Sequence, residues 1–98
     1  MSYRDEFPDY DEKGIYIPKG WADGSYHNDT CPHAYKRNAN DDEVIEARIW
    51  QDYKDPSKRE YENDKRYLFE IVVEGEPVYQ YLTDDLEKIK DIAKGVVM

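Results

Sequence analysis

The chain has 98 residues, which is the length of one small domain. It carries 23 acidic residues against 14 basic ones, for a net charge of −9 at pH 7. This charge disfavours direct contact with nucleic acid or with an anionic membrane, and it favours a basic protein partner. No apolar run approaches the roughly 20 residues that span a bilayer, and no secretory signal is evident, so we expect a cytoplasmic protein.

Residue composition also bears on folding. The single cysteine, Cys31, excludes an internal disulfide. Only 39% of the residues are hydrophobic, below the usual range, but ten Tyr, two Trp and two Phe are more aromatic residues than disordered chains carry. We therefore expect one folded domain over residues 1–98, in which residues 1–13 form an extended acidic arm.

The first half of the chain holds two candidate strands and a long connection. Ile15–Ile17 is a short apolar run ended by a proline, which suits a short edge strand. Residues 18–42 show no regular period and predict a long loop, and such loops are often functional. Residues 44–53 alternate between a more apolar and a more polar set, which predicts a strand.

The last third of the chain has the clearest structural signals. Tyr67–Val73 is rich in β-branched and aromatic residues and predicts a strand. Gly75 accepts the positive φ of a hairpin turn, so residues 78–82 are expected to return as the next strand. Thr83 or Asp84 is the predicted N-cap of a helix with one apolar face. The predicted fold class is α+β: a small antiparallel sheet of three to four strands with a C-terminal helix packed on one face.

One loop holds every histidine and cysteine of the chain. Its four side chains of metal-ligand type are His27, Asp29, Cys31 and His33. Their spacing matches none of the common structural zinc patterns, and a turn-rich loop with a buried Cys31 explains the same residues. We expect no cofactor, and keep as an alternative a small metal-binding or regulatory domain that uses His27, Cys31 and His33.

The sequence does not favour an enzyme. Cys31 with a neighbouring histidine could form a nucleophile and base, but the acidic surroundings disfavour the reactive thiolate. The paired carboxylates at residues 41–43 and 84–85 fall where a solvated turn and a helix cap are expected, whereas acid–base catalysis needs two carboxylates in a cleft. We therefore expect no catalytic residues.

Acidic groups interleaved with aromatic residues are the strongest functional signal. Carboxylates can take the place of phosphates in a basic groove, and Tyr and Trp are favoured anchors of protein interfaces. An acidic surface also serves solubility without any partner. The predicted partner-binding residues are Asp41, Asp42, Glu43, Glu46, Trp50, Asp52, Tyr53, Asp55, Glu60, Tyr61 and Glu62.

The stretch from Gly20 to Pro32, GWADGSYHNDTCP, resembles a block found in short uncharacterised proteins of phages and mobile elements. The shared pattern is Gly-Trp-x-Asp-x-Ser-aromatic-x-Asn-Asp-x-Cys-Pro, followed by an Asp-Pro turn, here Asp55-Pro56, and by an Arg-aromatic strand, here Arg66-Tyr67. The resemblance implies a mobile-element origin, and small acidic proteins of that origin include anti-CRISPR inhibitors.

These observations lead to one main functional hypothesis. The chain is expected to be a small acidic inhibitor that occludes the nucleic-acid-binding site of a basic partner, as an anti-CRISPR protein does with a CRISPR effector. A phage-encoded protein of this kind acts in the cytoplasm of the host cell. An immunity protein against a toxin is a further alternative, because it shares the acidic surface.

Overall fold

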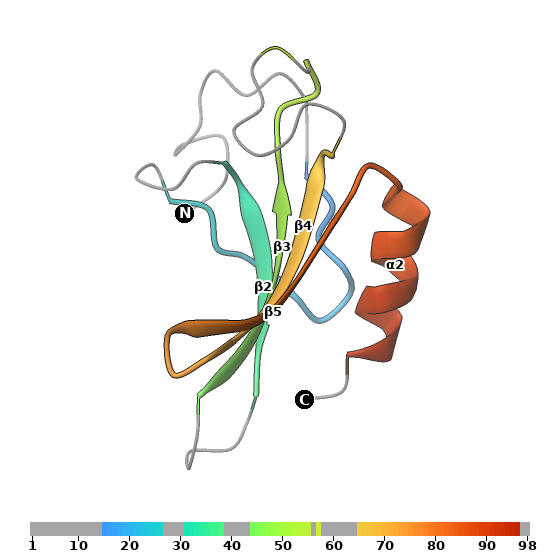
Figure 1. Cartoon of the computed structure of the whole chain (residues 1–98). Helices are drawn as coiled ribbons and strands as arrows, with labels where there is room; N and C mark the ends of the chain where they lie inside the picture. Colours follow the sequence, from blue (N-terminus) through green and yellow to red (C-terminus); the bar gives the residue numbers. More distant parts are fainter. Residues whose placement is uncertain (1–14, 27–30, 39–43, 56, 58–64, 97–98) are drawn as a thin grey trace.

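The computed structural model describes residues 15–26, 31–38, 44–55, 57 and 65–96. In these ranges the chain forms one antiparallel sheet of five strands and one helix (Figure 1). The elements in chain order are β1 (Ala22–Asp23), β2 (His33–Arg37), β3 (Ile45–Gln51), β4 (Tyr67–Val73), β5 (Glu76–Thr83) and α2 (Leu86–Gly95). The strands lie in the sheet in the same order as in the sequence, so the fold is an α+β meander.

The sheet has one or two strands more than the sequence predicted. The prediction of a loop over residues 18–42 was wrong, because β2 lies in this stretch and pairs with both β1 and β3. The predicted edge strand at Ile15–Ile17 was also wrong, since these residues form no strand and the short β1 takes the edge position. The predicted strands within residues 44–53 and at Tyr67–Val73 are confirmed as β3 and β4.

A hairpin turn at Gly75 joins β4 to β5, as predicted, but the turn has two residues and β5 begins at Glu76, before the predicted residues 78–82. Val73 pairs with Glu76 across the turn, and both turn residues have positive φ angles, 50° at Glu74 and 83° at Gly75. Such a turn matches the right-handed twist of the two strands that it connects. The side chain of Glu74 also accepts the backbone N–H of Val44 at 2.8 Å, which ties the turn to the start of β3.

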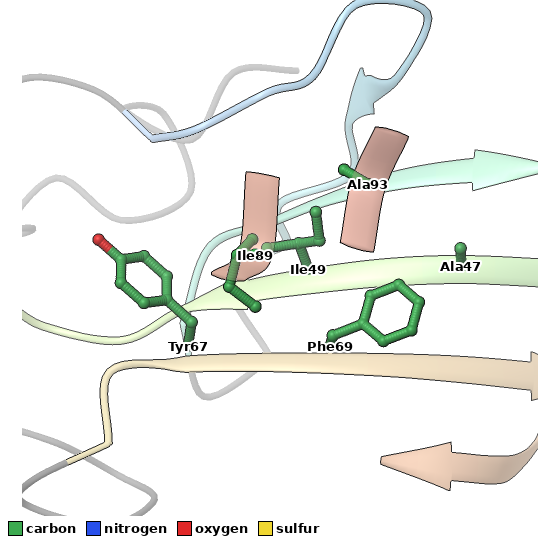
Figure 2. Packing of buried hydrophobic residues seen from close by; sticks show 6 residues of the cluster. All are labelled: Ala47, Ile49, Tyr67, Phe69, Ile89 and Ala93. Atoms are coloured by element: carbon green, nitrogen blue, oxygen red, sulfur yellow. The ribbon is translucent and has the colours of Figure 1, made fainter. Parts of the chain in front are cut away.

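The hydrophobic core lies between the sheet and α2, which runs along one side of the strands (Figure 1). Ile89 and Ala93 are four residues apart, so they lie on the same face of α2, and both are buried. Figure 2 shows the two helix residues against their partners from the strands, which are Ala47, Ile49, Tyr67 and Phe69. The predicted packing of a C-terminal helix on one face of the sheet is confirmed.

The N-cap of the helix lies one or two residues later than the predicted Thr83 or Asp84. Asp85 is the N-cap of α2, and its Oδ1 accepts the backbone N–H of Glu87 at 3.0 Å. Thr83 lies two residues before the cap, and its Oγ1 accepts the backbone N–H of Asp85 at 3.1 Å. Within the described ranges, no helix has both the length and the apolar character needed to cross a membrane.

Candidate functional site

The face of the sheet opposite α2 carries polar and aromatic side chains beside a small apolar cluster of Cys31, Trp50 and Leu68. Since side chains alternate along a strand, directly paired residues on neighbouring strands share a face. Pairing puts His33 opposite Trp50, Tyr35 opposite Arg48, Arg37 opposite Glu46, Arg48 opposite Glu70 and Glu70 opposite Gln80. We call this the polar face, made of His33, Tyr35, Arg37, Glu46, Arg48, Trp50, Glu70 and Gln80.

Two arginines bind one buried carboxylate on the polar face. Arg37 Nη2 donates to Oε1 of Glu46 at 3.3 Å. Arg48 donates to the other oxygen, Oε2, from Nε at 2.8 Å, and its Nη2 lies 2.7 Å from the same atom. Both oxygens of Glu46 are therefore occupied by guanidinium groups.

The second buried carboxylate, that of Glu70, is held by neutral donors. The indole Nε1 of Trp50 donates to Oε1 at 2.7 Å, and Gln80 Nε2 donates to Oε2 at 3.0 Å. Arg48 Nη1 lies 3.7 Å from Oε1 and adds an ion pair. Together with Glu46, these contacts form a network that crosses the sheet from β2 to β5 and contains two positive and two negative charges.

Next to this network, three aromatic rings are packed beside a glycine. The rings of His33 and Trp50 are stacked, with centroids 4.1 Å apart, and the Tyr35 ring is tilted against the histidine with centroids 6.3 Å apart. A Cβ at Gly24 would come within 2.6 Å of His33 Nε2 and 2.7 Å of Tyr35 Cδ1. Only glycine therefore allows the backbone of residue 24 to lie so close to the two rings.

A pocket of about 440 Å³ opens on the polar face beside these rings. This volume falls within the range of about 300–1,000 Å³ that is usual for small-molecule sites. Buried His33 and Trp50 line it together with Tyr35, whereas Tyr26 and the Arg37 side chain, 58% exposed, contribute its more exposed part. Arg48 and Glu46 complete the charged side of the pocket.

Three of the predicted partner-binding residues are buried. The exposed fractions of Glu46, Trp50 and Asp52 are 7%, 8% and 0%. Their assignment to an exposed surface was wrong, because each is held by interactions inside the domain. For Asp52, the backbone N–H donates to the carbonyl of Arg66 at 2.8 Å, and its own carbonyl accepts Arg66 Nε at 3.1 Å.

Two further predicted partner-binding residues belong to the segment after β3. Tyr53 is half-buried, and Asp55 is exposed and accepts both the backbone N–H and the hydroxyl of Ser57, at 3.0 and 2.8 Å. The other members of the predicted set lie outside the described residues: Asp41, Asp42, Glu43, Glu60, Tyr61 and Glu62. The predicted acidic arm over residues 1–13 also lies outside them.

The structure describes two of the four candidate metal ligands. Cys31 is fully buried in a small apolar cluster with Trp50 and Leu68, and His33 belongs to the aromatic stack. In the part of the chain that the structure describes, no three His, Cys, Asp or Glu side chains are placed to hold a metal ion together. The other two candidates, His27 and Asp29, lie outside that part.

Sequence reasoning missed the pocket residues Gly24, Tyr35, Arg37 and Arg48. His33, Tyr35 and Arg37 are two residues apart and so share one face once the stretch is known to be a strand, but HAYKR has no apolar alternation that predicts the strand itself. Nothing local to the sequence indicated that Gly24 would lie against them.

The excess negative charge is distributed unevenly along the chain. The described residues contain eleven acidic and ten basic residues, whereas the other 33 residues contain twelve acidic and only four basic ones. Among these other residues, the acidic triplet 41–43 belongs to the segment between β2 and β3, and Glu60, Glu62 and Asp64 belong to the segment between β3 and β4. The sheet and helix therefore form a nearly neutral framework, to which acid-rich segments are attached.

The fold and the site define a small α+β domain with a neutralised, pocketed sheet face and acid-rich connecting segments. No protein-family model, curated protein or solved structure matches the chain.

Proposed function

We propose that this chain is a small acidic inhibitor that covers the nucleic-acid-binding surface of a basic protein in the cytoplasm, in the manner of an anti-CRISPR protein acting on a CRISPR effector. The observation that carries the proposal is the uneven distribution of charge. The framework is nearly neutral, and eight of the nine excess negative charges belong to the segments outside it.

Negative charge concentrated in the segments outside the framework acts mainly on the rate of association with a partner. A basic groove that binds phosphates attracts carboxylates through the same field, and such attraction raises association rates and selects partners of opposite charge. Two of the carboxylates that the framework buries, those of Glu46 and Glu70, are balanced by Arg37 and Arg48 within the domain. They do not reduce the charge that the acid-rich segments present to a partner.

The burial of three predicted residues narrows the proposed interface. The acidic residues of the two connecting segments remain in it, namely Asp41, Asp42, Glu43, Glu60 and Glu62, with Tyr53, Asp55 and Tyr61 as neighbouring contacts. Glu46, Trp50 and Asp52 support the framework from inside and do not contact the partner in this proposal.

The proposal is tested by displacement of nucleic acid. A fluorescently labelled duplex or guide RNA is bound to a purified CRISPR effector, or to other basic nucleic-acid-binding proteins, and the chain is titrated in. We expect release of the nucleic acid, with an affinity that falls as NaCl is raised from about 50 mM to about 500 mM. Failure to displace nucleic acid from every protein of the panel at low salt would contradict the proposal.

A pair of variants with the same change in charge separates a specific interface from net charge. The first variant, D41N/D42N/E43Q, neutralises the triplet between β2 and β3. The control, E76Q/D84N/D91N, neutralises three exposed acidic residues of the framework. We expect the affinity measured by displacement to fall about tenfold or more for the first variant and much less for the control. Equal losses would show that only net charge matters.

A further inference from the structure

The acidic groups that line the pocket on the polar face already bind partners within the protein. Oε1 of Glu46 accepts Arg37, and Oε2 accepts Arg48. At the β1 side of the pocket, Oδ1 of Asp23 accepts the backbone N–H of Ser25 at 3.0 Å. The carboxylates that line the pocket are therefore engaged inside the protein, and they are poorly suited to bind a cationic ligand.

Donor groups, by contrast, remain available in the same pocket. A guanidinium has five N–H donors. Within the described residues, Arg37 uses only Nη2, and Arg48 uses Nε and Nη2, while its Nη1 lies 3.7 Å from Glu70, beyond hydrogen-bond distance. The hydroxyl of Tyr35 makes no hydrogen bond in the part of the chain that the structure describes. The pocket thus offers donors from three side chains on two adjacent strands.

We infer that this pocket binds a phosphate monoester carried on a small planar group, the class that nucleoside monophosphates represent. A phosphate monoester has three terminal oxygens, and arginine is the preferred side chain for binding them. The pocket of about 440 Å³ is also much larger than a phosphate alone requires. Tyr26 and Tyr35 line the remaining space, and tyrosine rings are suited to stack on a planar group.

Contacts within the domain hold two residues of the site, Arg48 and His33, in place. Arg48 bonds to Glu46, and His33 packs against both the Trp50 ring and the backbone of Gly24. Rigid donors lose little conformational freedom on binding, which favours affinity. The net charge of −9 opposes polyanions more than small anions, because repulsion grows with the charge of the ligand. A small phosphate compound therefore suits this chain better than the end of a nucleic acid strand.

This inference does not depend on the inhibitor function, and it is tested by titrating the ¹⁵N-labelled full chain in separate samples. The probes are adenosine 5′-monophosphate, adenosine, inorganic phosphate and a 5′-phosphorylated DNA hexamer. We expect adenosine monophosphate to cause saturable shifts in the amide signals of Gly24, Ser25, Arg37 and Arg48. Adenosine, which lacks the phosphate, is expected to bind about tenfold more weakly or worse.

Three results would overturn the inference. The first is the absence of saturable shifts at these residues with adenosine monophosphate up to about 10 mM, which corresponds to negligible affinity. The second is equal binding of inorganic phosphate, which would remove the planar group from the proposal. The third is tighter binding of the DNA hexamer, which would assign the pocket to a nucleic acid terminus.

Two variants of one strand locate the bound phosphate. Arg37→Gln removes a pocket donor from a largely exposed side chain, and Lys36→Gln removes the same charge from the opposite face, where Lys36 pairs with Ala47. We expect Arg37→Gln to weaken the binding of adenosine monophosphate by about tenfold or more. Lys36→Gln should change this affinity by less than about twofold. Equal weakening would mean that only net charge attracts the ligand, and would overturn the inference. The displacement assay with a basic protein reports on the other proposal, so either can fail alone.

Discussion

The indole Nε1 of Trp50 donates a 2.7 Å hydrogen bond to the carboxylate of Glu70 on the neighbouring strand. Both residues are buried. A buried carboxylate is costly unless donors bind it, and only two neutral donors, Trp50 and Gln80, contact Glu70 at hydrogen-bond distance within the described residues. The bond links the aromatic stack of the pocket to the charged network, so Trp50 supports both.

Replacing Trp50 by Phe tests this link, because it removes the donor and keeps an aromatic ring. We expect the free energy of unfolding to fall by about 1–3 kcal/mol, as measured by urea denaturation. Part of this loss comes from the smaller ring, so the same change is also made in a Glu70→Met background. There the cost should be smaller by about 0.5 kcal/mol or more, which is the coupling between the two residues. The same cost in both backgrounds would contradict the role of the hydrogen bond.

The two arginines that bind Glu46 should differ in their effect on stability. Arg48 approaches the carboxylate with Nε and Nη2 and is 30% exposed, whereas Arg37 contacts it once and is largely exposed. We expect Arg48→Met to lower the free energy of unfolding by about 2–3 kcal/mol, because a buried carboxylate loses its main donors. Arg37→Met should cost at most about 1 kcal/mol, as is usual for exposed ion pairs. Equal losses in urea denaturation would refute this ranking.

The elements predicted correctly are those with a local signal. β4 has a dense run of β-branched and aromatic residues, and α2 has apolar residues at helical spacing after a capping acid. β2 was missed because both of its faces contain polar side chains, so its five residues have no apolar alternation. Its position depends on pairing with Ile45–Gln51, and such long-range pairing is not encoded in a short window of sequence.

The candidate site was harder to predict than the fold. Charge alone assigned Glu46 and Asp52 to the surface, although arginine partners elsewhere in the chain stabilise one of them and Arg66 fixes the other. The pocket joins residues from Asp23 to Trp50, and only the register of β1, β2 and β3 brings them together. The residue types that are close together in the sequence therefore gave little information about the pocket.

Two glycines provide a matched test of the hairpin turn. Gly75 has a φ of 83°, whereas Gly95 at the end of α2 lacks a positive φ, and a Cβ added there would meet no atom within 4 Å. We expect Gly75→Ala to cost about 1–2 kcal/mol, because the left-handed conformation places Cβ against the backbone. Gly95→Ala should be neutral or stabilise the protein by up to about 1 kcal/mol. Thermal unfolding of both variants measures the difference, and equal midpoints would contradict the expectation.

Two neighbouring acidic residues, Asp84 and Asp85, allow the capping bond of α2 to be separated from the effect of charge on the helix dipole. If Asp85 is the N-cap, as the 3.0 Å bond to the Glu87 N–H indicates, Asp85→Ala should lower the free energy of unfolding by about 1 kcal/mol. Asp84→Ala removes an equal charge one residue earlier, so it has a similar effect on the helix dipole but breaks no capping bond; we expect a change within about 0.5 kcal/mol. A larger loss for Asp84→Ala than for Asp85→Ala in urea denaturation would contradict Asp85 as the N-cap.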